Sequence, residues 1–125
     1  MEFKIDTKPS YTIITPVSER LSANLTDALR QKWEELTESG SENLAIDLQN
    51  CSDVEESAYE ALVKMHEDWY SNGQSLVFTN LQPGLSKALK EQGLTDVVNI
   101  APTMAEAADI ISMEVLERDL FKEES

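Results

Sequence analysis

Leu44-Ala45-Ile46-Asp47-Leu48-Gln49-Asn50-Cys51-Ser52-Asp53-Val54-Glu55-Glu56-Ser57 is the stretch that decides the fold class of this chain. Its first residues, Leu44 to Leu48, are mostly apolar, and so short a run is typical of a buried strand. The polar residues from Asn50 to Asp53 favour a turn, because such side chains hydrogen-bond nearby backbone. A helix is predicted from Ser57 to about Tyr70. Strand, loop and helix form half of a βαβ unit, whose functional groups usually lie at the carboxyl end of the strand.

Patterns on both sides extend this unit over the chain. Before it, we predict two strands paired as a hairpin, Met1–Asp6 and Tyr11–Thr15. An apolar stripe at three- and four-residue spacing predicts a helix over 21–36, capped by Ser18 or Ser22. After it, we predict a strand at Ser75–Thr79, a helix from Leu85 to Gly93, a strand at Val97–Ile100, and a last helix after Pro102 in which Thr103 and Glu106 have capping-box spacing.

The resulting element order is β-β-α-β-α-β-α-β-α. Helices between consecutive strands favour a layered α/β fold with right-handed crossovers. We therefore predict a single domain over residues 1–120, with a mixed, mostly parallel sheet of about four or five strands and about four helices. Residues 121–125 are expected to form a frayed acidic tail.

The chain is strongly acidic. Its 125 residues include 10 Lys and Arg against 24 Asp and Glu, a formal net charge of −14. This charge would repel a phosphate backbone, so we expect no nucleic-acid partner, and it opposes self-association, so we expect a monomer or weak dimer. It fits either solubility or steering toward a basic protein surface. The amino terminus lacks the apolar core of a signal peptide and no stretch is long enough to span a membrane, so we expect a cytoplasmic protein without membrane insertion.

The sequence carries no pattern typical of an enzyme. His66 is the one histidine; we expect it on the helix surface, too far along the helix to form a Ser-His-Asp arrangement with Ser57. No zinc, calcium or nucleotide motif occurs, so we predict no metal, no cofactor and no catalytic residue. The single cysteine, Cys51, has no cationic neighbour in the sequence and is interpreted as a small apolar plug.

The stretch that opens this section resembles the STAS fold, the family of bacterial anti-sigma-factor antagonists. In that family a buried strand ending in Asp-Leu leads through a short loop to Asp-Ser-Ser-Gly-Leu, and the second serine is phosphorylated. Ile46-Asp47-Leu48 matches the strand end, and Glu55-Glu56-Ser57-Ala58-Tyr59 falls on the phosphorylation motif. Only Ser57 is identical; Glu55 is a conservative match, and the other three residues depart from the motif.

The resemblance implies a regulatory binding module that docks on a kinase-like anti-sigma factor, with a serine phosphatase as a second candidate partner. Ser57 is the candidate phosphorylation site, and a helix start suits a phosphate because it offers free backbone N–H groups. Glu55 and Glu56 would repel that phosphate and partly imitate it. The candidate partner-binding residues are Asn50, Cys51, Ser52, Asp53, Glu55, Glu56, Ser57 and Tyr59.

Two alternatives remain open. One keeps the docking surface and lacks the phosphorylation switch, since the motif around Ser57 has drifted. The other is a structural role, in which a STAS-like subunit supports an ABC-type transporter complex. Neighbouring genes for an anti-sigma factor and a phosphatase would favour the regulatory role, and transporter genes would favour the structural one.

Overall fold

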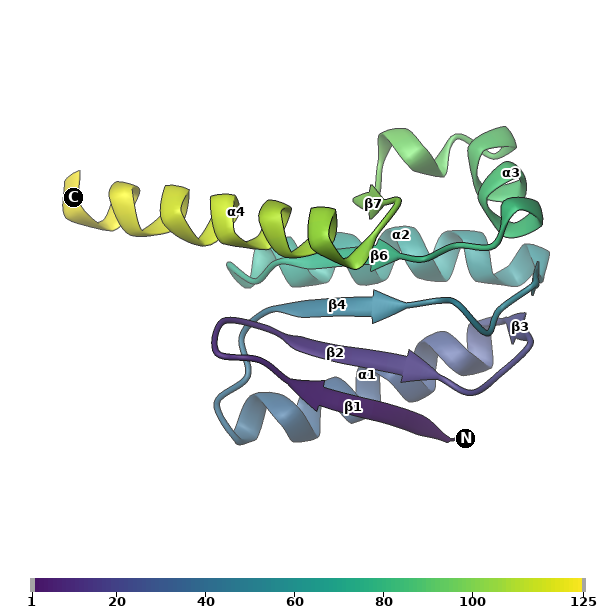
Figure 1. Cartoon of the computed structure of the whole chain (residues 1–125), viewed down its shortest axis with the longest axis horizontal. Coiled ribbons are helices and arrows are strands. Elements are labelled where there is room, and N and C mark those ends of the chain that lie inside the picture. The colour runs from purple at the N-terminus through teal and green to yellow at the C-terminus, as the bar shows by residue number, and fades with distance from the viewer. Residues whose placement is uncertain (1, 125) are drawn as a thin grey trace.

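The fold is built on a five-stranded sheet with the strand order β1-β2-β4-β6-β7. The computed structural model describes residues 2–124, and the side chains of residues 2–121. The strands are β1 (Phe3–Thr7), β2 (Thr12–Pro16), β4 (Leu44–Asp47), β6 (Leu76–Thr79) and β7 (Ile100–Ala101). Only β1 is antiparallel to its neighbour; the other pairings are parallel. The predicted mixed, mostly parallel sheet is confirmed (Figure 1).

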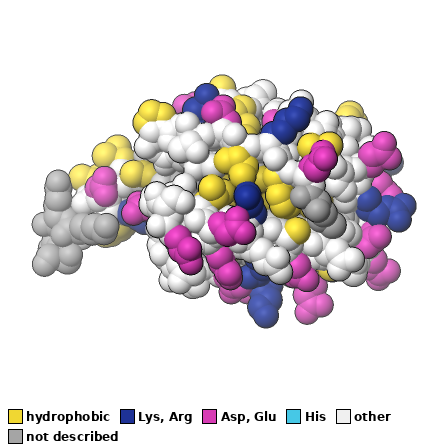
Figure 2. All heavy atoms as spheres, turned by 90° about the horizontal axis from the view of Figure 1, so that it is seen from below, with side chains coloured by type: hydrophobic (Ala, Val, Ile, Leu, Met, Phe, Trp, Pro, Cys, Tyr) yellow, Lys and Arg dark blue, Asp and Glu magenta, His cyan; other side chains and the backbone are white. Residues whose placement is uncertain are grey.

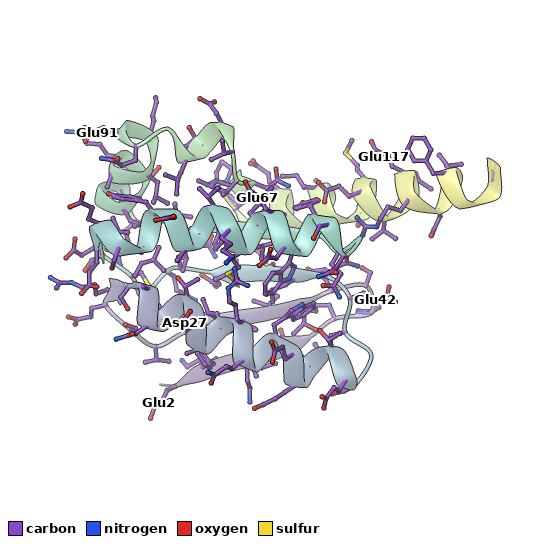
Figure 3. The ribbon with its side chains drawn as sticks, turned by 180° about the vertical axis from the view of Figure 1, so that it is seen from behind. Glu2, Asp27, Glu42, Glu67, Glu91 and Glu117 are labelled. Carbon is purple, nitrogen blue, oxygen red and sulfur yellow. The ribbon has the colours of Figure 1, made fainter. Side chains whose placement is uncertain are left out.

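Two long helices cover one face of the sheet. They are α1 (Ala23–Glu38) and α2 (Glu56–Ser71), whose apolar stripes meet the buried residues Ile14, Ile46 and Phe78 of the strands. Trp33 of α1 stacks on Trp69 of α2 with ring centroids 5.7 Å apart, so both belong to the core as their helical spacing predicts. Figure 3 shows this face from behind, with α1 and α2 side by side in front of the strands.

The other helices follow the last strands. α3 (Pro83–Glu91) leads into a short 3₁₀ helix (Leu94–Asp96), and α4 (Met104–Glu124) crosses the second face of the sheet. Ala107 and Ile111 of α4 pack there on Ile13 and Val77. The start of α4 is capped by the Thr103 side chain, which accepts a hydrogen bond from the backbone N–H of Glu106 at 3.2 Å. No helix in the described part of the chain is both long and apolar enough to cross a membrane.

A second, two-stranded sheet is present that the sequence patterns did not indicate. It pairs β3 (Arg20–Leu21) with β5 (Asp53–Val54) in parallel. Strands of two residues show no hydrophobic period, so only their pairing reveals them. Its strand β3 comes directly before α1, and β5 comes directly before α2. The start of α1 is capped by the hydroxyl of Ser22, which accepts from the backbone N–H of Leu25 at 3.1 Å.

Element boundaries differ from the prediction near the carboxyl end. The strand expected at Val97–Ile100 is β7, at Ile100–Ala101, because Gly93 at φ 75° starts a 3₁₀ turn that brings Leu94 and Val98 into the core. The backbone of α4 continues to Glu124. Ser125 and the side chains of residues 122–124 lie outside the described residues, as does Met1, so the frayed tail over 121–125 stays a prediction.

Candidate functional site

The candidate site lies at one edge of the sheet, where three parallel strands end and three helices begin. The loops after β2, β4 and β6 meet there, and α1, α2 and α3 start from them (Figure 1). This is the edge at which open α/β sheets usually carry their functional groups. The opening stretch of sequence supplies its centre.

Ser57 is the second residue of α2, and its side chain is exposed. Glu55 is the amino-terminal cap residue; its carbonyl accepts from the N–H of Ala58 at 2.9 Å, and its carboxylate makes no capping hydrogen bond. The first backbone N–H groups of a helix have no partner within it, and the helix dipole favours negative charge there. A phosphate on Ser57 could therefore be held by α2 itself.

Three charged side chains form an exposed ion cluster next to this helix start. Arg20 of β3 contacts the carboxylate of Asp53 at 2.9 Å and that of Glu55 at 3.5 Å. Its Nε also donates to Asp53 at 3.1 Å. Arg20 was not among the predicted site residues, because its neighbours in the sequence do not reveal the pairing of β3 with β5. The charge of Glu55 is thus partly neutralised, whereas Glu56 has no ion-pair partner among the described residues.

Backbone hydrogen bonds fix the loop between β4 and α2. The N–H of Ser52 donates to the carbonyl of Glu19 at 2.8 Å, and the N–H of Glu55 donates to the carbonyl of Leu21 at 2.8 Å. Asn50 adds a side-chain bond, from its Nδ2 to the carbonyl of Pro16 at 3.2 Å. A loop held at this many points presents Ser57 in a defined position.

Gln82, the cap residue before α3, donates from its Nε2 to the carbonyl of Gln49 at 2.9 Å. α3 also passes close to the loop at Gly84, where a Cβ would lie 3.8 Å from the carbonyl oxygen of Ser52. These contacts join the third helix start to the same edge.

Most of the predicted partner-binding residues share this surface. Ser52, Asp53, Glu56 and Ser57 are exposed, while Asn50, Glu55 and Tyr59 are half-buried. Cys51 is the exception, since its side chain is fully buried and its thiol donates to the carbonyl of Ser18 at 3.2 Å. Burial raises the pKa of the Cys51 thiol to about 11. Cys51 therefore supports the loop from inside and is removed from the surface that a partner could contact, which corrects its place in the predicted set.

His66 is not the surface residue that the sequence suggested. It is half-buried in α2 and its ring lies 4.5 Å from the ring of Tyr70, because α4 packs near this side of the helix. Burial lowers the pKa of His66, and the nearby carboxylates of Glu114 and Glu67 act in the opposite direction. Tyr70 itself donates to Glu114 at 2.6 Å, so the histidine sits beside a hydrogen-bonded contact between α2 and α4.

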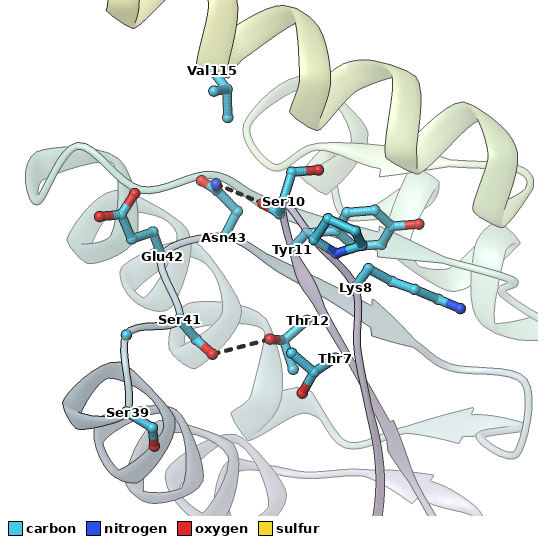
Figure 4. A pocket seen from close by; sticks show the side chains of 12 residues that line it. Thr7, Lys8, Ser10, Tyr11, Thr12, Ser39, Ser41, Glu42, Asn43 and Val115 are labelled. Carbon is cyan, nitrogen blue, oxygen red and sulfur yellow. Dashed lines mark hydrogen bonds between the residues drawn. The ribbon is translucent and has the colours of Figure 1, made fainter.

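A polar pocket lies at the opposite edge of the sheet, between the β1–β2 hairpin and the segment that joins α1 to β4 (Figure 4). It encloses about 290 Å³ and is spanned by hydrogen bonds between neighbouring segments. Thr12 and Ser41 hydroxyls lie 3.1 Å apart, and Asn43 Nδ2 donates to the carbonyl of Ser10 at 3.0 Å. Across residues 2–121, no three His, Cys, Asp or Glu side chains gather in a way that could hold a metal ion.

Comparisons with known proteins bear on the family and the fold. A family model described as the STAS domain matches residues 2–107. A comparison with curated proteins found no match.

Among solved structures, an anti-sigma factor antagonist from Mycobacterium paratuberculosis is 14% identical, with a TM-score of 0.71, covering 89% of this chain and 93% of its own. The anti-sigma factor antagonist SpoIIAA of Bacillus, in its unphosphorylated form, is 15% identical with a TM-score of 0.65. The match covers 89% of this chain and 96% of SpoIIAA. The phosphorylated form of SpoIIAA also matches. A sulfate transporter family protein from Wolinella succinogenes is 14% identical with a TM-score of 0.67, and the match covers 82% of this chain and 85% of that protein's chain. At these identities the likeness concerns the fold.

Proposed function

Because this chain belongs to the STAS domain family, as the match over residues 2–107 establishes, we propose that it is a regulatory protein-binding module similar to an anti-sigma-factor antagonist. The surface around Asn50–Tyr59 docks on a kinase-like anti-sigma factor, and Ser57 is the phosphorylation switch. The observation that carries the proposal is the exposed Ser57 hydroxyl at the start of α2, on the edge where the strands end. The role is binding rather than catalysis.

The proposed modification is a phosphoryl transfer from ATP bound to the partner kinase. Ser57 Oγ forms a bond to the γ-phosphorus, the bond from that phosphorus to the bridging oxygen breaks, and ADP leaves. The hydroxyl proton passes to a base of the kinase. A serine phosphatase would reverse the modification by hydrolysis.

The electrostatics of the edge explain how a phosphate would release the partner. A phosphate adds a charge of about −1.5 to −2 at neutral pH. At the interface it would have to lose its water next to Glu56, which has no compensating cation among the described residues. Arg20 is already engaged with Asp53 and Glu55. Like-charge repulsion and the cost of desolvation therefore both oppose docking of the phosphorylated chain.

The test is a calorimetric titration of the chain against the candidate anti-sigma factor from the same organism. Ser57→Asp is expected to weaken binding by roughly tenfold or more, which corresponds to about 1.4 kcal/mol. Glu56→Ser, which restores the family's residue, should strengthen binding because it removes an unpaired charge. Ser10→Asp adds the same charge at an exposed position on the opposite edge and should leave the affinity unchanged.

If Ser57→Asp and Glu56→Ser both leave the affinity unchanged, this edge is not the switch. The alternative role, a structural subunit of an ABC-type transporter complex, would then be preferred, in keeping with the fold shared with a sulfate transporter family protein. Ser57→Asp should not lower stability in either case, because the helix dipole favours a carboxylate in the first turn of α2.

A further inference from the structure

Helix α4 carries apolar side chains on two opposite faces. Its inner face packs on the sheet through Ala107, Ile111 and Val115. On the outer face, Met113 is 63% exposed, Leu116 60% and Leu120 51%. At 3.6 residues per turn these three side chains lie within about 60° of one another and point away from the inner face. We call Met113, Leu116 and Leu120 the outer stripe.

The outer stripe runs along α4 toward its carboxyl end, past the turn where Arg118 contacts Ser75 and Asn43 at the sheet. In Figure 1 the helix leaves the body of the molecule at the edge opposite the start of α2, and Figure 2 shows hydrophobic side chains along this projecting end. The family match ends at residue 107, so the stripe also lies outside the segment that the family model covers. An exposed apolar stripe of this kind on a projecting helix is typical of a binding surface.

The charges around the stripe decide what could cover it. Asp109, Glu117 and Asp119 are exposed on α4. Arg118 is the one basic residue among the described side chains of this helix. It points to the sheet, where it donates to Ser75 Oγ at 3.0 Å and to Asn43 Oδ1 at 2.9 Å. A second copy, with its net charge of −14, would bring like charges against these acids. An anionic membrane surface would be repelled in the same way.

We propose that the outer stripe binds a basic amphipathic helix of a partner protein, in which apolar side chains are flanked by Lys and Arg. The apolar side chains of such a helix would cover the stripe, and its bases would face the carboxylates of Asp109 and Glu117. This surface is at the opposite end of the domain from Ser57. It does not depend on the proposed switch, and a partner bound there would leave the edge at Ser57 free.

The test uses a synthetic peptide of Leu and Lys, about 14 residues or four turns long, with Leu at helical spacing. A control peptide has every Leu replaced by Ser and keeps the charge. Fluorescence anisotropy of the labelled peptide measures its binding to the whole chain. We expect the Leu peptide to bind at least about tenfold more tightly than the Ser peptide, because only the former can cover the stripe.

Matched variants of the chain locate the contact. Leu116→Gln with Leu120→Gln should weaken binding of the Leu peptide by about tenfold or more, whereas Val97→Gln, at a residue 50% exposed elsewhere, should not change it. Asp109→Lys with Glu117→Lys should weaken it as well. These positions are at the surface, so circular dichroism should find the fold intact.

Three results would overturn the proposal. The first is equal binding of the Leu and Ser peptides to the wild type, or equal binding of the Leu peptide to the wild type and to the Leu116→Gln/Leu120→Gln variant. Either result would mean that the peptide is attracted to any acidic surface. The second is sedimentation of the wild-type chain as a dimer that the double variant dissociates, which would assign the stripe to a second copy. The third is co-sedimentation with phosphatidylcholine or phosphatidylglycerol vesicles, lost in the double variant, which would assign it to a membrane.

Discussion

Replacing Arg118 with methionine is expected to lower the free energy of unfolding by about 2 kcal/mol. The guanidinium donates to Ser75 Oγ at 3.0 Å and to Asn43 Oδ1 at 2.9 Å, and both of these residues are buried. Asn43 Oδ1 keeps a second donor, the backbone N–H of Ser75 at 3.1 Å, whereas no other donor reaches Ser75 Oγ among the described residues. Leaving one buried acceptor unpaired costs about 1–3 kcal/mol. Methionine retains most of the aliphatic stem, so little packing is lost.

Arg20→Met is the matched control. This arginine also loses two contacts, to Asp53 and Glu55, but its side chain is 60% exposed. Exposed ion pairs contribute about 0–1 kcal/mol, so the control should lose less than about 1 kcal/mol. Urea unfolding followed by tryptophan fluorescence measures both, since Trp33 and Trp69 are stacked in the core. Equal losses in the two variants would refute the reasoning that the buried contacts of Arg118 hold α4 on the sheet.

Three further predictions concern buried groups. Burial raises the pKa of the Cys51 thiol to about 11. Near pH 8 this thiol should therefore react with a thiol reagent roughly 100-fold more slowly in the native chain than in the chain unfolded in urea. A fast reaction of the native chain would contradict the burial of Cys51. Burial lowers the pKa of His66 below its usual 6.5, so the unfolded chain binds the proton more readily than the folded chain. The free energy of unfolding should therefore fall as the pH drops through and below 6.5. Urea midpoints measured over this pH range should fall less for His66→Gln than for the wild type. Leu62→Ala, in the core, should lower the free energy of unfolding by about 2–5 kcal/mol. The control Leu116→Ala, at an exposed position, should lower it by less than about 0.5 kcal/mol. Similar losses in the two variants would be inconsistent with the packing.

The architecture could be predicted from the sequence because each main element carries a clear period. The apolar run at Leu44–Leu48 and the stripe that includes Trp33 are buried as expected. The boundaries near Val97 could not be predicted, since the same apolar residues suit a strand or a 3₁₀ turn, and the left-handed backbone of Gly93 decides between them. β3 and β5 are too short to show any period.

The candidate site was predictable only in part. The position of Ser57 follows from a strand, a loop and a helix in sequence order. The pairing of Arg20 with Asp53 and Glu55 depends on two segments more than 30 residues apart meeting in the small sheet. The burial of Cys51 likewise depends on the loop folding inward, which turn-forming neighbours do not reveal.

Hydrogen exchange of the chain, with and without the kinase-like anti-sigma factor, tests the proposed docking surface most directly. The N–H groups of Glu56 and Ser57, at the start of α2, have no partner within the helix, so we expect them to exchange rapidly in the free chain and their protection to be readily measured. The account predicts slower exchange over residues 50–59 on adding the partner, no change over the outer stripe at 113–120, and loss of the protection in Ser57→Asp. Protection confined to any other part of the chain, or protection of 50–59 that Ser57→Asp leaves intact, would contradict it.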